Sequence, residues 1–288
     1  MAKIKLSKSK IIAGLQCPKR LWLQVHRPDL LRESEQTQQS YDNGNQLGVI
    51  AQSLYPDGML IEDIFNPPKA LADTQETLLR SQTIPIFEAA FSHDDVLIRA
   101  DLTFKDCDGL RVVEVKSSTS VKEYHLNDCA IQSWVIESAG YNLKQIELAH
   151  VDSSFVYEGD GNYHGILSHE NVTEQIEPLK QQVKDWVIYF KNVLESDMPE
   201  ISTGTQCRTP FDCPFNDFCN PNPPEFPLTL LSYSKKFIQE MQNQGIFDVR
   251  GVPQEILKTE KQHRILEATL SGKAIIVELH SELTHLSI

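Results

Sequence analysis

Long apolar runs are missing from this sequence of 288 residues. Residues 1–17, MAKIKLSKSKIIAGLQC, contain only apolar stretches too short for the core of a secretory signal, and no later segment reaches the length of a membrane span. We therefore expect a cytoplasmic protein that has no membrane as a partner. In that compartment its six cysteines would be thiols or metal ligands rather than disulfides.

Two motifs of known function are also absent. The sequence has no G-x-x-x-x-G-K-[ST] loop, so ATP-driven unwinding of a nucleic acid would have to come from another protein, such as a helicase. Its nine histidines form no i, i+4 pair and no H-x-x-H pair, which are spacings of a histidine metal site. The histidines therefore give no indication of a metal site.

Positive charge is scarce and unevenly placed. The formal net charge of -13 argues against indiscriminate binding to nucleic acid, because affinity for a polyanion needs local positive charge. Residues 1–28, however, contain seven of the 27 basic residues and none of the 40 acidic ones. This patch is either a solvated helix face or a surface that touches phosphate. The nucleic-acid-binding candidates are Lys8, Lys10, Lys19 and Arg20.

The hydrophobic pattern predicts an α/β fold with a mixed central sheet flanked by helices. Three short β-branched segments, separated by the turn sequences HDD and DCDG, predict antiparallel strands within 84–92, 96–104 and 110–118. An apolar stripe predicts a helix at 123–141 that ends before Gly140, and a strand at 145–157 would run parallel to its predecessor. A long amphipathic helix is expected at 174–196.

Helix-ending and loop-forming residues set the organisation around this core. Ser7 is expected to cap a first helix, which Cys17-Pro18 ends. The small residues Gly44, Gly48 and Ala51 favour close packing of a later helix. The proline-rich stretch NPNPPEFP at 220–227 predicts a boundary. We therefore expect a domain at 1–227. Residues 228–288 would form a small appendage with a helix near 229–244, a C-cap at Gly245, and further helix and strand.

Two acidic residues and a lysine are expected to meet in the hairpin of these strands. Twelve residues separate Asp101 from Glu114, which brings their carboxylates opposite each other, and Lys116 shares a strand face with Glu114. Such a group is expensive to desolvate unless a cation and substrate phosphates complete it. Carboxylates bind Mg²⁺ or Mn²⁺, and Lys116 would orient the attacking water. Glu88 is placed to supply a third carboxylate. The alternative is a surface ion pair.

Three short motifs, RAD (99–101), EVKSS (114–118) and DCAIQ (128–132), resemble the RecB-like branch of the PD-(D/E)XK nucleases. The resemblance implies a restriction-endonuclease-like core in which the aspartate and glutamate hold the divalent metal and the lysine assists the water. It also implies that the glutamine on the following helix supports the site. The catalytic residues would then be Asp101, Glu114, Lys116 and Gln132. The divalent-metal set would be Glu88, Asp101, Glu114 and Val115.

Four cysteines bracket this core. Cys207, Cys213 and Cys219 are separated by five residues each, and Cys17 lies in the N-terminal segment. An iron–sulfur cluster commonly takes four thiolates from loops. Structural Zn²⁺ on the same thiolates is the alternative, although the paired C-x-x-C of zinc ribbons is missing. The arrangement resembles the iron–sulfur nucleases of the CRISPR-associated RecB-like and AddB-type families, which implies a 4Fe-4S cluster that clasps the two ends of the nuclease core.

The N-terminal segments LSKSKIIAGLQCPKRLWL and GNQLGVIAQSLYPDG also look like an uncharacterised bacterial family, often fused to an RNase H-like exonuclease domain. Together these resemblances imply a metal-dependent deoxyribonuclease that hydrolyses phosphodiester bonds. We expect an exonuclease that prefers single-stranded DNA. A non-catalytic nucleic-acid-binding or scaffolding module that keeps the fold is one alternative. A structural zinc protein that serves as a docking platform is the other.

Overall fold

The computed structural model describes residues 6–63, 65–80, 84–231, 233 and 235–273. The chain divides into two compact units. One unit comprises Met1–Ser202 and Gln206–Asn216, and the other comprises Thr203–Thr205 and Asp217–Ile288. The first unit holds the sheet and the expected active-site residues, so it is described first.

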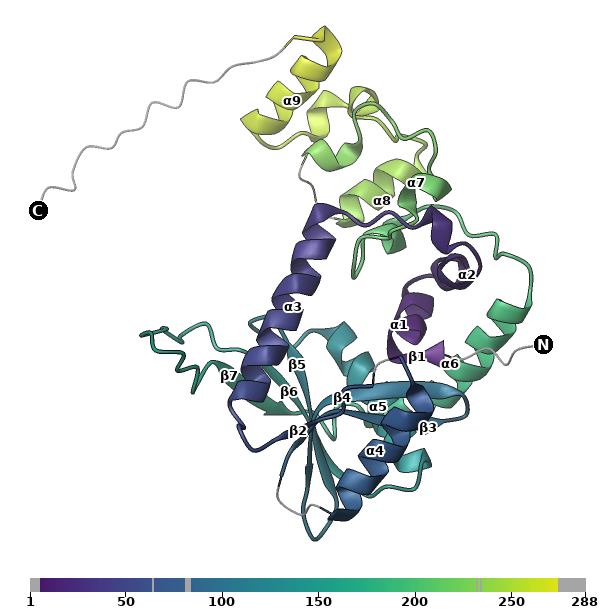
Figure 1. Cartoon of the computed structure of the whole chain (residues 1–288). Helices are drawn as coiled ribbons and strands as arrows, with labels where there is room; N and C mark the ends of the chain where they lie inside the picture. Colours follow the sequence, from purple (N-terminus) through teal and green to yellow (C-terminus); the bar gives the residue numbers. More distant parts are fainter. Residues whose placement is uncertain (1–5, 64, 81–83, 232, 234, 274–288) are drawn as a thin grey trace, which may run out of the picture. The chain divides into compact units, whose positions relative to one another are not determined.

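The first unit is built on a mixed sheet of seven strands within the described residues (Figure 1). The strand order is β2-β3-β4-β5-β6-β7, and β1 pairs with β4. The β3–β4 and β4–β5 pairs are antiparallel, whereas β5 and β6 are parallel. The strands are β1 (Leu6–Ser7), β2 (Met59–Leu60), β3 (Ile86–His93), β4 (Val96–Lys105), β5 (Leu110–Lys116), β6 (Leu143–Val151) and β7 (Leu167–Asn171).

Six α-helices of the first unit surround this sheet. They are α1 (Lys8–Gln16), α2 (Pro18–His26), α3 (Glu35–Ser53), α4 (Pro67–Arg80), α5 (Glu123–Ser138) and α6 (Glu177–Glu195). The Ser7 side chain accepts a hydrogen bond from the backbone of Lys10 and so caps α1, and Pro18 begins α2 one residue after Cys17. The α5 helix makes the crossover between the parallel strands β5 and β6.

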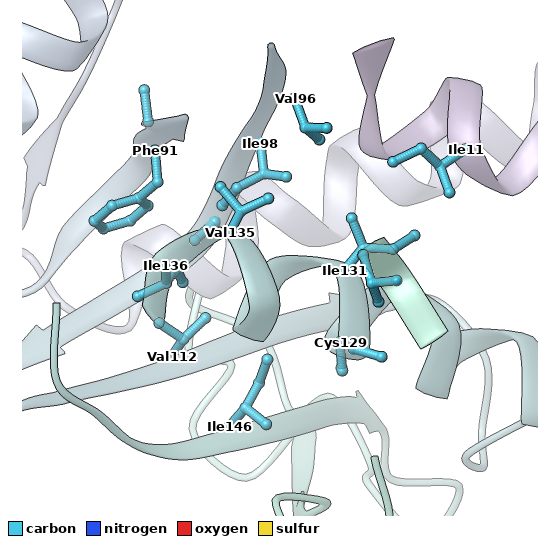
Figure 2. Close-up of a cluster of buried hydrophobic side chains, with 14 of the residues drawn as sticks. Ile11, Phe91, Val96, Ile98, Val112, Cys129, Ile131, Val135, Ile136 and Ile146 are labelled. Atoms are coloured by element: carbon cyan, nitrogen blue, oxygen red, sulfur yellow. The ribbon is translucent and has the colours of Figure 1, made fainter. Parts of the chain in front are cut away.

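The main hydrophobic core lies between α5 and the sheet (Figure 2). Ile131, Val135 and Ile136 of α5 are fully buried against strand residues such as Val112 and Ile146. Burying each such side chain stabilises the fold by about 1.5–3 kcal/mol relative to leaving it in water. This packing fixes α5 on the sheet, and therefore fixes every side chain that α5 directs toward the strands.

The expected α/β fold with a mixed central sheet flanked by helices is confirmed. The three antiparallel strands, the helix before Gly140, the parallel strand after it and the long helix α6 all occur. The expectation of close packing is wrong at Gly44 and Gly48, because nothing outside the helix's own backbone lies within 4 Å of a Cβ built at either position, whereas Ala51 on the same helix is buried. The polar segment before Gly44 belongs to the same helix α3.

The second unit has its own small hydrophobic core. Its helices are α8 (Lys235–Asn243) and α9 (Glu260–Ser271), and the short α7 (Asn216–Cys219) begins at the border of the units. Gly245 has a φ of 79°, and its N–H donates to the carbonyl of Gln242, as expected of a residue that ends a helix. The strand predicted near the C-terminus lies outside the described residues. None of the described helices is long and apolar enough to cross a membrane.

Candidate active site in a gap beside strand β4

One edge of β4 is left open between two partner strands. β3 pairs with β4 along one edge, from Val96 to Thr103. On the other edge, β1 pairs with Val96 and Leu97, and β5 pairs with residues 102–105. Within the described residues, 98–101 therefore have no strand partner on this edge. Because β1 runs parallel and β5 antiparallel to β4, Lys8 and Glu114 enter the gap from opposite ends.

Asp101 lies inside this gap. Its Oδ2 accepts a hydrogen bond from the backbone N–H of Val115 at 2.7 Å. The Asp101 side chain therefore accepts the hydrogen bond that a backbone carbonyl would accept in a continuous strand pair. Burial, followed by the nearby Glu114 carboxylate, raises the pKa of Asp101 to about 7. Around neutral pH this carboxyl therefore carries a proton in part of the molecules.

Glu114 is buried, with 2% of its surface exposed, and three side chains hold its carboxylate. Lys8 and Lys116 both donate to Oε1, at 2.6 and 2.7 Å, and the Gln132 Nε2 donates to Oε2 at 2.6 Å. Burial alone would raise the pKa of Glu114, but the two ammonium groups outweigh it and the pKa is lowered. Glu114 is thus ionised beside a carboxyl that is not fully ionised.

Lys116 contacts a second carboxylate on α5. Its Nζ donates to Asp128 Oδ2 at 2.5 Å as well as to Glu114. Burial would lower the pKa of Lys116, but attraction to these two carboxylates raises it well above its usual value. Asp128 and Gln132 are four residues apart, so they project from the same face of α5 toward the strands. The sequence motif DCAIQ contained Asp128, but its contact with Lys116 was not predicted.

Glu88 lies on β3, opposite Asp101 in the register of the β3–β4 pair, although the two are not themselves a paired position. Its backbone φ is 55°, which is unusual for a residue with a side chain. Its carboxylate accepts from Arg99 Nε at 3.1 Å. The structure therefore places Glu88 across the opposite edge of β4 from the gap and in an ion pair with Arg99, and its role as a third metal ligand remains a prediction.

The donor atoms of the gap suit a hard divalent cation. A carboxyl with a raised pKa beside an ionised carboxylate is an arrangement that such a cation stabilises, because its charge favours ionisation of both. Gln132 adds a further polar atom, since its Oε1 is buried without a hydrogen-bond partner among the described residues. A water molecule of the site would supply the missing donor. Among the described residues no group of three or more His, Cys, Asp or Glu side chains is already arranged around an ion position.

Three of the four predicted cluster cysteines lie in the first unit. Cys213 donates its backbone N–H to the carbonyl of Cys207 at 2.8 Å. Burial raises the pKa of the Cys213 thiol, and Cys207 and Cys17 are near enough to raise it further. The Gln16 side chain bonds the carbonyls of Gln206 and Phe211, which ties the end of α1 to the cysteine segment. Cys219 belongs to the second unit.

Two of the four predicted nucleic-acid-binding residues, Lys8 and Arg20, have different side-chain partners in the described part of the chain. Lys8 lies in the gap, whereas the Arg20 guanidinium donates to Gln16 and is close enough to Cys213 to lower the pKa of that thiol. Lys10 lies on α1 and Lys19 on α2, both partly exposed. The structure thus separates Lys8, which faces carboxylates, from Arg20, which faces the cysteine segment.

Comparison with known proteins assigns no family to the chain. No protein-family model matches it, and no curated protein matches it. Among solved structures, the "Crystal structure of SSO0001" is similar to this chain at 13% identity and a TM-score of 0.37. The match covers 75% of this chain and 85% of that chain. A likeness this distant carries no argument about function.

Proposed function

We propose that this protein is a metal-dependent DNA nuclease that hydrolyses phosphodiester bonds in the gap beside β4. The observation that supports the proposal most strongly is that Asp101, Glu114 and Lys116, from two strands, meet at a site with Gln132 from α5. The choice of DNA, the preference for single strands and the exonucleolytic mode follow the resemblance to RecB-like nucleases. A restriction-endonuclease-like fold is part of the same proposal.

The four predicted catalytic residues have distinct roles in this reaction. Asp101 and Glu114, with the carbonyl of Val115, would hold Mg²⁺ or Mn²⁺. The bound cation would polarise the phosphodiester and acidify a water molecule. Lys116, fixed between Glu114 and Asp128, directs its ammonium group toward the attacking water and the charge that develops on phosphorus. Gln132 keeps the Glu114 carboxylate in place by its hydrogen bond.

The hydrolysis itself is balanced by water alone. The water oxygen forms a bond to phosphorus, the bond from phosphorus to one ester oxygen breaks, and the departing alcohol oxygen takes up a proton. Lys116 has a raised pKa, so it remains charged through this step and acts as an electrostatic partner rather than as a base.

A 4Fe-4S cluster on Cys17, Cys207, Cys213 and Cys219 is the second part of the proposal. The proximity of Cys17 to Cys207 and Cys213 supports it, because these thiols come from distant parts of the sequence. The cluster would clasp the segment after α1 to the segment after α6. Structural Zn²⁺ on the same thiolates is the alternative, and the two are separated by iron and zinc analysis together with visible absorbance.

The test is cleavage of end-labelled single- and double-stranded DNA with Mn²⁺ or Mg²⁺ by anaerobically purified protein. Glu114→Gln keeps the side-chain volume but removes the charge, so we expect it to bind DNA and not to cut it. Glu267→Gln removes an exposed carboxylate of α9 and is the matched control. Cleavage by Glu114→Gln at the wild-type rate would remove Glu114 from the mechanism. Binding without cleavage by the wild type, with its cluster intact, would favour the non-catalytic module.

A further inference from the structure

Lys8 is the residue of the gap for which the proposed mechanism has no use. It is the first residue of α1, directly after β1, and its side chain is 20% exposed. The β1–β4 pairing, with Leu6 opposite Val96 and Ser7 opposite Leu97, carries Lys8 to the open edge of β4. A lysine delivered to this position by a two-residue strand and a capped helix is held by the backbone.

Lys8 and Lys116 differ in how they are held. Lys116 is fixed between two carboxylates, Glu114 and Asp128, whereas Glu114 is the one carboxylate that Lys8 contacts among the described residues. Both ammonium groups share the same oxygen, Glu114 Oε1. A cation that takes this oxygen as a ligand must therefore compete with Lys8, and Lys8 can leave without giving up another ion pair among the described residues.

We propose that Lys8 is a second active-site lysine. Without a metal ion it binds Glu114 Oε1. When a divalent cation binds Glu114 Oε1, the Lys8 side chain turns to a non-bridging oxygen of the scissile phosphodiester. The contact between Lys8 and the phosphodiester rests on the proposed nuclease function. The competition between the Lys8 ammonium group and a cation for Glu114 Oε1 is argued from the contact that Lys8 and Glu114 make in the structure.

The balance of charge in the gap supports the contact between Lys8 and the phosphodiester. The gap holds three carboxylates, Asp101, Glu114 and Asp128, and two ammonium groups, Lys8 and Lys116. With one divalent cation and all these groups ionised, a single positive charge is left over, which one phosphodiester neutralises. Without Lys8 the same site is already neutral and loses its attraction for an anionic substrate.

The proposal predicts that Lys8→Met strengthens the binding of Mn²⁺ but slows the cleavage of DNA. Lys8→Met keeps most of the side-chain length and removes the charge, while Lys116 and Gln132 still hold Glu114. Because the charged hydrogen bond that opposes the ion is gone, we expect the Kd for Mn²⁺ to fall about tenfold. At saturating Mn²⁺ we expect kcat for DNA to fall about tenfold or more, because one contact to the phosphate is lost.

The experiment measures both quantities on the full chain. Free Mn²⁺ is followed by its electron paramagnetic resonance signal during titration, and cleavage of end-labelled DNA is followed at saturating Mn²⁺. Lys8→Arg should keep much of the cleavage, since a guanidinium also binds phosphate. Lys184→Met, an exposed lysine of α6, is the matched control for loss of a charge. Thermal unfolding of all four proteins identifies any variant that does not fold.

The outcomes separate the two proposals. Tighter Mn²⁺ binding with slower cleavage by Lys8→Met supports the inference. Unchanged Mn²⁺ affinity in folded Lys8→Met would overturn the competition, and unchanged kcat would overturn the phosphate contact. If the wild type never cleaves but Lys8→Met binds Mn²⁺ more tightly, the nuclease function is lost while the competition at Glu114 stands.

Discussion

Gly14 offers a quantitative test of how α1 is held against the long helix α6. A Cβ built at Gly14 would lie 2.6 Å from Cε1 and 2.8 Å from Cδ1 of Phe190, whereas carbon atoms in good contact lie about 3.5–4.0 Å apart. Phe190 is 2% exposed, so its ring has little room to move. Gly14→Ala should therefore force α1 away from α6 or the ring away from its rotamer.

The expected cost follows from two opposing effects. Overpacking of a well-packed core costs about 1–3 kcal/mol, and alanine gains about 0.5–1 kcal/mol over glycine inside a helix. Gly14→Ala should therefore be destabilised by up to about 2.5 kcal/mol on balance. Gly48→Ala is the matched control, because a Cβ there meets nothing within 4 Å and only the helix gain of about 0.5–1 kcal/mol applies.

Urea unfolding of the wild type and both variants measures this difference, provided that the three m-values agree. The midpoint should fall for Gly14→Ala and rise for Gly48→Ala. A Gly14→Ala protein at least as stable as the wild type would refute the close approach of the two helices. Because α1 carries Lys8 at its start, a displaced α1 should in addition slow the metal-dependent cleavage of DNA.

Three further predictions concern the site and the cluster. Asp128→Asn should lower kcat about tenfold with little change in KM. Because Asp128 helps to raise the pKa of Lys116, the alkaline limb of the pH–rate profile should also move to lower pH. An alkaline limb at the wild-type pH would argue against this positioning role. Burial, and then Lys116, lowers the pKa of His125 from 6.5 to about 4. Between pH 6.5 and about pH 4 the unfolded chain therefore binds more protons than the folded chain. In urea titrations over this pH range, the wild type should lose stability on acidification more steeply than His125→Gln. The same pH dependence of stability in both proteins would contradict this. Cys207→Ser should bleach the visible absorbance and lower the Tm, and a colourless wild type with one zinc per chain would exclude the iron–sulfur cluster.

The strands and helices with strong local patterns were predictable. The hairpin strands alternate or are continuously apolar, and α5 is rich in apolar residues, most of which are buried. The helix α4 was not predicted, and two of its four buried residues are threonines, Thr74 and Thr77, rather than large apolar side chains. The Thr74 hydroxyl instead accepts a hydrogen bond from the backbone of Ala90 in β3, a tertiary contact that no local pattern encodes. The strands β1 and β2, of two residues each, exist only through their partners.

The same distinction applies to the site. Asp101, Glu114 and Lys116 lie on neighbouring strands joined by a turn, so their meeting follows from strand geometry. Lys8 is 106 residues from Glu114 in the sequence, and tertiary contacts such as the pairing of β1 with β4 bring them together. The sequence showed a basic N-terminal patch without separating the lysine that enters the gap from Arg20, which bonds Gln16 on α1.

The position of β1 also governs the order in which the site is assembled during synthesis. Leu6 and Ser7 leave the ribosome early, but their partners Val96 and Leu97 follow much later, and Glu114 and Gln132 later still. Pairing so distant in sequence cannot begin until the intervening chain has emerged. The nascent protein therefore has an unfinished site until β4, β5 and α5 have all emerged from the ribosome.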